Sequence, residues 1–208
     1  MSAQSDRPHR PSLRADLTAL IDAAGGELPG SRAELAAATA AVVVQAGREP
    51  VQVGADDARF VDLADRIGLE TLAALWRDSE PVSLPGALWA LYLLRQWCHS
   101  SGDELSRLWR AGEPLAGADA AVAGMAALAD AEAVRRVADD VLAGVYRGDF
   151  AVALERAAAL FRVIAAGRRE LAPADERGQA ELALASRNER AAADLGAAAA
   201  RWRAGTLC

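Results

Sequence analysis

The chain has 208 residues, a formal net charge of −6 and an aromatic content of only 5%. A chain of this length can bury a core of its own as one domain, without disulfides or a structural metal. The acidic balance and the lack of a basic patch argue against a nucleic-acid-binding protein. The longest apolar stretch, Ala87 to Leu94, is too short to span a membrane.

The composition also indicates the compartment. The two cysteines, Cys98 and Cys208, cannot form a disulfide framework and fit a reduced cytosol. The first residues carry arginines without a following apolar segment, so we expect no signal peptide there. All 23 basic residues are arginine, which is typical of proteins encoded by GC-rich bacterial genomes. We therefore expect a cytoplasmic bacterial protein.

Alanine is the commonest residue and β-branched residues are sparse, which favours helices over strands. Residues 1–11 are polar and carry two prolines, so we expect a disordered tail there. Residues 12–208 read as a single all-helical domain. Apolar spacing and capping residues predict helices over 12–24, 31–47, 56–67, 70–78, 84–98, 101–112, 119–128, 130–147, 149–167 and 173–203.

The helices group into pairs, because turn residues interrupt the chain near Pro50, Pro81, Pro114 and Gly148. We therefore expect an all-α fold, a multi-helix bundle of about nine to ten helices arranged as consecutive helical hairpins. A short irregular α-solenoid is the alternative, since similar helix ends recur at similar intervals. The fifth helix, over 84–98, is apolar nearly all round and is expected to be the most buried element.

A recurring phrase ends three of these helices. Leucine, two residues, an aliphatic residue and an aromatic residue precede Arg77, Arg110 and Arg147. Helical spacing predicts that each aromatic ring is buried and that the arginine beside it lies at the rim of the core. The alternative is that the three guanidinium groups form a row that binds carboxylates or a phosphate of a partner.

The last helix, over 173–203, is long but carries few large apolar residues. Leu195 and Trp202 are the main ones, amid many alanines. A stripe that the fold leaves uncovered tends to find a partner, so this helix is expected to support protein binding or self-association. Deleting residues 180–208 should then leave a folded core.

The fifth helix concentrates side chains that could line an apolar ligand pocket. They are Trp89, Tyr92, Trp97 and His99. The alternative is a core helix whose polar tips reach its edge.

Residues 141–155 resemble the turn of a tetratricopeptide unit in two motifs, Gly148-Asp149-Phe150 and Ala153-Leu154. The resemblance covers one helix pair and implies a peptide-binding helical scaffold. The tyrosine expected four residues before the turn glycine is Gly144 here, and no second copy follows the pattern.

Catalytic and metal-binding patterns are weak. Cys98 and His99 are adjacent, so a helix points them in different directions, and acidic pairs such as Asp139-Asp140 lack the spacing of a metal site. No phosphate-binding glycine motif occurs. We therefore expect no metal, no cofactor and no catalytic residues. The sequence favours a non-enzymatic protein that binds another protein; the alternative is a small-molecule binder or an unrecognised enzyme.

Overall fold

The computed structural model describes residues 32–46, 75–124, 130–146 and 149–208. These residues form seven α-helices and one short 3-10 helix, and none of them lies in a strand. The all-α prediction is confirmed for this part of the chain. No described helix is long and apolar enough to cross a membrane. The expected tail at 1–11 and the expected helices over 12–24 and 56–67 lie outside the described residues.

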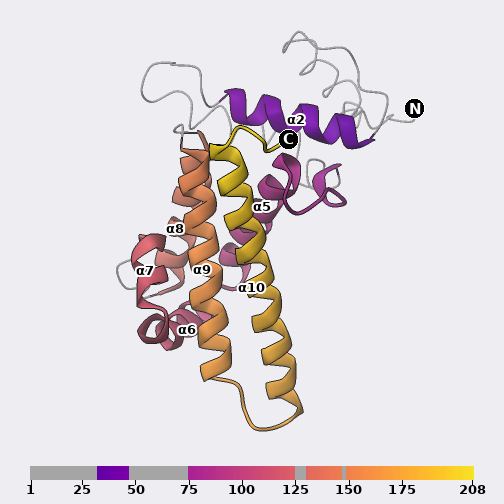
Figure 1. Cartoon of the computed structure of the whole chain (residues 1–208). Helices are drawn as coiled ribbons and strands as arrows, with labels where there is room; N and C mark the ends of the chain where they lie inside the picture. Colours follow the sequence, from indigo (N-terminus) through magenta and orange to yellow (C-terminus); the bar gives the residue numbers. More distant parts are fainter. Residues whose placement is uncertain (1–31, 47–74, 125–129, 147–148) are drawn as a thin grey trace, which may run out of the picture.

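The elements follow one another along the chain as a packed set of helices (Figure 1). Their bounds are α2 (Arg32–Ala46), α5 (Leu84–Ser100), α6 (Gly102–Gly112), the 3-10 helix η1 (Glu113–Leu115), α7 (Gly117–Ala123), α8 (Ala131–Tyr146), α9 (Phe150–Glu170) and α10 (Glu176–Arg203).

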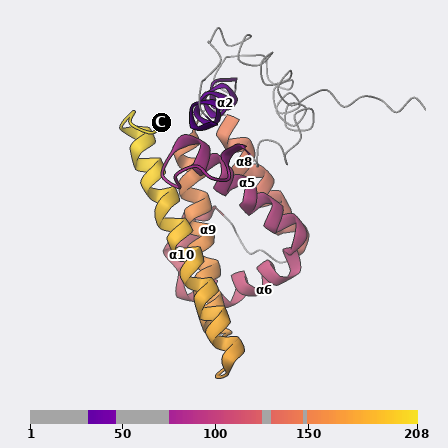
Figure 2. The ribbon, with the colours of Figure 1, turned by 90° about the vertical axis from the view of Figure 1, so that its right-hand side faces the viewer.

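The longest feature is an antiparallel hairpin of α9 and α10, which lie side by side in both views (Figures 1 and 2). The Asp175 carboxylate caps α10 by accepting hydrogen bonds from the backbone N–H groups of Arg177 and Gly178. The helix therefore begins three residues later than the sequence pattern predicted. At the other end of the hairpin the rings of Phe150 and Trp202 meet edge to face, with centroids 4.9 Å apart.

The stripe of α10 that the sequence analysis expected to be underfilled is covered by α9. Its buried residues alternate at intervals of three and four, as in a coiled coil: Ala185, Asn188, Ala192, Leu195 and Ala199. Small side chains let the two helix axes approach closely. The apolar surface of this stripe is therefore used within the chain.

A second close contact joins α6 and α9 through two glycines. A Cβ atom on Gly112 would lie 2.0 Å from the carbonyl oxygen of Val163, and one on Gly167 would lie 1.9 Å from that of Leu108. The absence of side chains at both positions lets the two backbones touch. Gly167 was expected to end its helix, but α9 continues to Glu170. This glycine lies inside the helix, where it lets α9 approach the backbone of α6.

The central element is α9 rather than α5. It packs against α5, α6, α7, α8 and α10, and its buried residues lie all around it. The expectation that α5 is the most buried helix was wrong, since one side of α5 faces solvent and includes Leu93 and Gln96. The alanines of α9 explain the difference, because they allow several helices to approach one axis.

A buried arginine of α9 links three neighbouring helices. The Arg168 side chain is only 6% exposed, and its guanidinium donates to Glu181 of α10 at 2.6 Å and to Glu104 of α6 at 3.2 Å. It also lies over the ring of Trp97, 5.5 Å from the centroid, while Trp97 stacks on Phe161. One side chain of α9 thus contacts α5, α6 and α10.

The helix α2 lies across one end of the hairpin (Figures 1 and 2) and packs on α5. The indole Nε1 of Trp76 donates to the hydroxyl of Thr39 in α2 at 3.1 Å. The segment after α10 returns to the start of α5, where the backbone N–H of Leu84 donates to the carbonyl oxygen of Cys208 at 2.7 Å. This fixes the first turn of α5.

Candidate functional site

The candidate site lies on the solvent-facing side of α5. The hydroxyl of Ser83 caps this helix by accepting from the backbone N–H of Gly86, and Pro85 fits its first turn. One side of the helix is buried, including Leu91, Leu94 and Cys98. The opposite side carries four residues at intervals of three and four, which we call the outer face of α5: Trp89, Leu93, Gln96 and Ser100.

The outer face combines a half-buried aromatic ring with an exposed aliphatic side chain. Trp89 packs partly against the core, and Leu93 is 45% exposed. Gln96 and Ser100 are exposed and continue the face toward the end of the helix. The face is therefore apolar in its first half and polar in its second.

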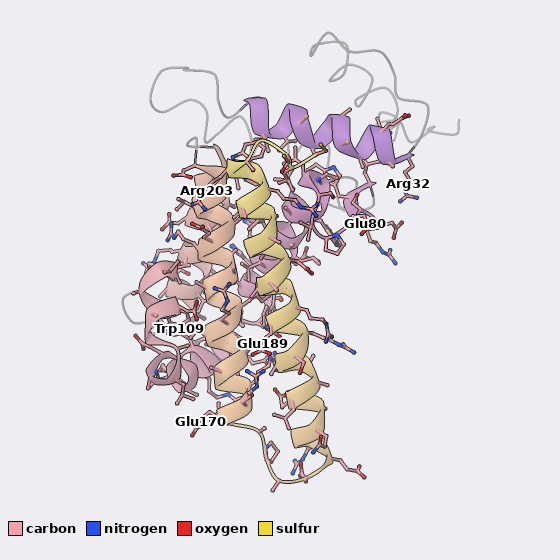
Figure 3. The ribbon with its side chains drawn as sticks, in the orientation of Figure 1. Arg32, Glu80, Trp109, Glu170, Glu189 and Arg203 are labelled. Atoms are coloured by element: carbon pink, nitrogen blue, oxygen red, sulfur yellow. The ribbon has the colours of Figure 1, made fainter. Side chains whose placement is uncertain are left out.

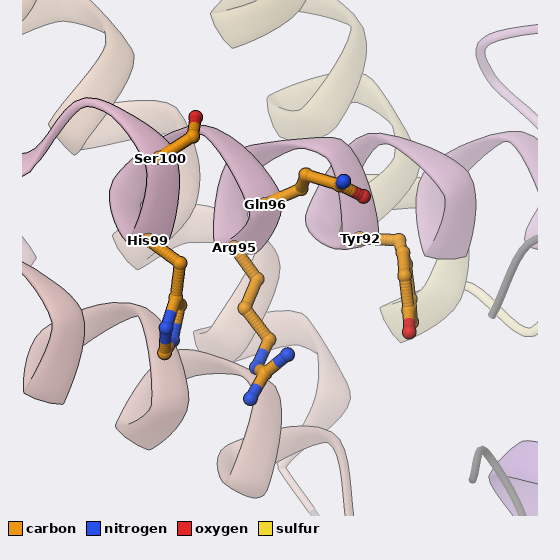
Figure 4. Close-up of a pocket in the computed structure, with 5 residues that line it drawn as sticks. All are labelled: Tyr92, Arg95, Gln96, His99 and Ser100. Atoms are coloured by element: carbon orange, nitrogen blue, oxygen red, sulfur yellow. The ribbon is translucent and has the colours of Figure 1, made fainter.

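Beside the outer face lies an open hollow of about 370 Å³, which we call the α5 hollow (Figure 4). Its lining residues all belong to α5: Tyr92, Arg95, Gln96, His99 and Ser100. Arg95 and His99 project from the same side of the helix (Figure 4), because they lie four residues apart. Each lining residue carries a polar group, but most of the lining surface is apolar, and ligand binding by the predicted residues stays a prediction.

Asp139 of α8 joins the two basic side chains of the hollow. Its Oδ1 atom accepts a hydrogen bond from Nε of Arg95 at 2.7 Å and lies 3.0 Å from Nε2 of His99. All three side chains are between one third and one half exposed. The cluster is thus an accessible, mutually oriented group of one carboxylate, one guanidinium and one imidazole.

The chemistry of this cluster suits recognition of a polar group. The hydroxyl of Ser100, which follows His99 in the chain, donates to the carbonyl oxygen of Trp97 at 3.3 Å. Cys98 lies on the buried side of α5, and burial, followed by the charge of Asp139, raises the pKa of its thiol to about 12. The described residues contain no group of three side chains that could hold a metal ion.

The predicted pocket residues are only partly brought together. Tyr92 and His99 line the α5 hollow, and Trp89 lies on the outer face. Trp97 is not among the lining residues of the hollow and packs against Phe161 of α9. Sequence reasoning missed Arg95 and Asp139; the spacing of Arg95 and His99 was a usable signal, but Asp139 lies forty residues beyond His99.

Two of the predicted partner-binding arginines, Arg77 and Arg110, are exposed, and the row that they would form with Arg147 stays a prediction. Trp76 and Trp109 are buried and Arg77 and Arg110 are exposed, which confirms the predicted pairing of a core ring with a rim arginine. Figure 3 places Trp109 beside the lower half of α9 and Glu80, three residues after Arg77, near α2 at the other end of the molecule. Arg147 lies outside the described residues.

The two partner-binding candidates of the last helix belong to the hairpin. Leu195 is only 1% exposed and lies in the stripe that α9 covers. Trp202 is partly buried against Phe150. Neither side chain is presented to a partner in this structure.

No protein family, curated protein or solved structure matches the chain. The function has to be inferred from the chemistry of its own surface.

Proposed function

We propose that the chain is a non-enzymatic helical adaptor, a bundle of about nine to ten helices that binds a protein partner on the outer face of α5. The observation that carries the proposal is the exposure of Leu93 beside Trp89, on a helix whose remaining apolar residues are buried or half-buried. Protein interfaces place such apolar anchors at their centre and polar side chains at their rim.

The energetics of this face fit a moderate-affinity interface. Burying a fully exposed leucine contributes about 1.5–3 kcal/mol, so covering Leu93, which is less than half exposed, contributes about half of that, and Trp89 beside it adds apolar area. The polar half of the face and the α5 hollow supply hydrogen-bond donors for orientation. We further propose that the adaptor works in the bacterial cytoplasm, which the free thiols of Cys98 and Cys208 support.

The test is affinity purification from the native cell with mass spectrometry, comparing the wild type with Leu93→Glu. Leu182→Glu is the matched control, since Leu182 is also an exposed leucine on a helix, 38% exposed on α10. We expect one partner to co-purify with the wild type and the control and to be lost with Leu93→Glu. Equal recovery with Leu93→Glu, or no specific partner at all, would contradict the proposal.

A second candidate function is the binding of a small molecule in the α5 hollow. The observation that favours it is the convergence of Tyr92, Arg95 and His99 on one hollow. A ligand that binds the folded state raises the melting temperature. A metabolite panel should then contain a compound that stabilises the wild type and has no effect on Arg95→Gln; a panel without such a compound removes this candidate.

A further inference from the structure

We propose that the α5 hollow receives a carboxylate, supplied by an aspartate or glutamate side chain of the protein partner, and that the terminal nitrogens of Arg95 hold it. The inference rests on the proposed function, because it names the polar contact that accompanies the apolar one at Leu93. Three features of the hollow support it: a guanidinium edge left available, a fixed guanidinium position and a low net charge.

The available edge follows from the geometry of the Arg95–Asp139 pair. Asp139 accepts from Nε, on the side of the guanidinium. In the described part of the chain, the two terminal nitrogens of Arg95 donate to no protein acceptor, and the side chain is 33% exposed. The end of the guanidinium therefore presents two parallel donors, which match the two oxygens of a carboxylate.

The position of this guanidinium is fixed before any partner binds. Asp139 is held by two groups at once, Arg95 at 2.7 Å and His99 at 3.0 Å. An arginine that is already ordered loses less side-chain entropy on binding than one that moves freely. The ordering of Arg95 by Asp139 therefore lowers the entropy that is lost when Arg95 binds a carboxylate.

The net charge of the hollow favours a carboxylate over a phosphate. The negative charge of Asp139 offsets the positive charge of Arg95, so the hollow has no strong cationic field for a doubly charged anion. Short-range, directional hydrogen bonds remain, with Gln96 and Ser100 at the hollow as further polar groups. A singly charged, planar acceptor satisfies this donor set best.

The two contacts also specify the kind of partner. Leu93 and Arg95 lie at the two edges of the surface that Gln96 and Ser100 occupy between them. A peptide segment that covers Gln96 and Ser100 can therefore reach Leu93 with an apolar residue and Arg95 with a carboxylate. The expected partner is an amphipathic segment that combines Leu, Ile or Phe with Asp or Glu.

The experiment is selection of a random-peptide display library on the full-length chain, followed by affinity measurement of the selected peptides. We expect enriched peptides to carry an acidic residue near an apolar one. Affinity should fall by about tenfold or more with Arg95→Gln. It should fall by a similar factor when the peptide's acidic residue is replaced by its amide, and the two changes together should cost little more than either one.

Arg95→Lys tests whether the two parallel donors matter beyond the charge, since lysine keeps the charge but loses these donors. We expect an affinity between that of the wild type and that of Arg95→Gln. Circular dichroism of each variant checks that the fold is retained. Selected peptides that lose affinity with Leu93→Glu but not with Arg95→Gln overturn the carboxylate site and leave the proposed function standing. Peptides that tolerate both changes, or a library that yields no binder, overturn both. Equal competition by free acetate and by inorganic phosphate would also contradict the preference for a carboxylate.

Discussion

Single residues of this chain matter most where two backbones touch. Gly167 of α9 sits where a side chain would collide with the carbonyl oxygen of Leu108, whereas a Cβ atom on Gly196 of α10 would meet only a terminal guanidinium nitrogen of Arg162 at 3.7 Å. Both glycines lie inside helices, where alanine is otherwise preferred. Their surroundings therefore predict opposite effects for the same substitution.

We expect Gly167→Ala to lower the free energy of unfolding by about 2–3 kcal/mol, because the α6–α9 crossing must open. Gly196→Ala should raise it by up to about 1 kcal/mol, because it restores helix propensity in ordinary contact distance. Urea denaturation of both variants measures the difference. A Gly167→Ala variant as stable as the wild type would show that the two backbones do not meet as described.

Two neighbouring arginines provide a second contrast. Arg168 is buried and contacts three helices, while the Arg169–Glu189 ion pair is almost half exposed. We expect Arg168→Ala to cost about 3 kcal/mol, since it leaves a cavity and unpairs two carboxylates. Arg169→Ala should cost less than about 1 kcal/mol, as is usual for surface ion pairs. Similar melting temperatures for the two variants would contradict the buried role of Arg168.

At the scale of elements, the α9–α10 hairpin is closed along one edge by two ion pairs. Arg203 donates to both oxygens of Glu155, and Arg169 pairs with Glu189. These hydrogen bonds hold the pKa values of the Glu155 and Glu189 carboxyls below their ordinary range. Folding therefore favours the ionised form of both groups.

This coupling makes the hairpin sensitive to acid. Since the two pKa values are lower in the folded than in the unfolded chain, the stabilisation is complete above about pH 5 and is lost as the pH falls through the folded values. The double variant Glu155→Gln, Glu189→Gln should show a shallower loss of stability between about pH 4.5 and pH 3 than the wild type. Parallel curves in thermal unfolding across that range would mean that the pairs do not act in solution.

The positions of the described helices along the chain could be predicted from the sequence, but which helix is the most buried could not. Leu195 was singled out in the sequence and does lie in the buried stripe of α10, but the alanines around it looked underfilled because the approach of α9 is not visible in one helix. For the same reason α5 was expected to be central, since its large apolar residues outweigh the alanines of α9 in any measure of hydrophobicity. Two helices approach closely where their side chains are small, and small side chains count for little in a measure of hydrophobicity.

The candidate site was half visible in the sequence. Tyr92 and His99 were selected because they share a helix, and helical spacing also puts Arg95 beside them. Asp139, which orients Arg95 and His99, comes from α8, and its position depends on how α8 packs against α5. No local pattern specifies that register.

For the whole molecule, α9 is the axis on which the other helices are built, and α5 presents its outer face to solvent. The long last helix, whose apolar stripe was expected to lie uncovered, packs on α9, whereas α5 carries the exposed apolar side chain of Leu93 on its outer face. The proposed adaptor therefore has a rigid body behind its recognition helix, which suits the capture of a partner segment without rearrangement.

The most direct measurement is photo-crosslinking in the native cell from a benzophenone amino acid placed at position 93, with position 182 as the control. We expect one protein to be crosslinked from position 93 and not from position 182. Crosslinks of equal yield and identity from both positions, or none from position 93, would contradict a binding surface on α5.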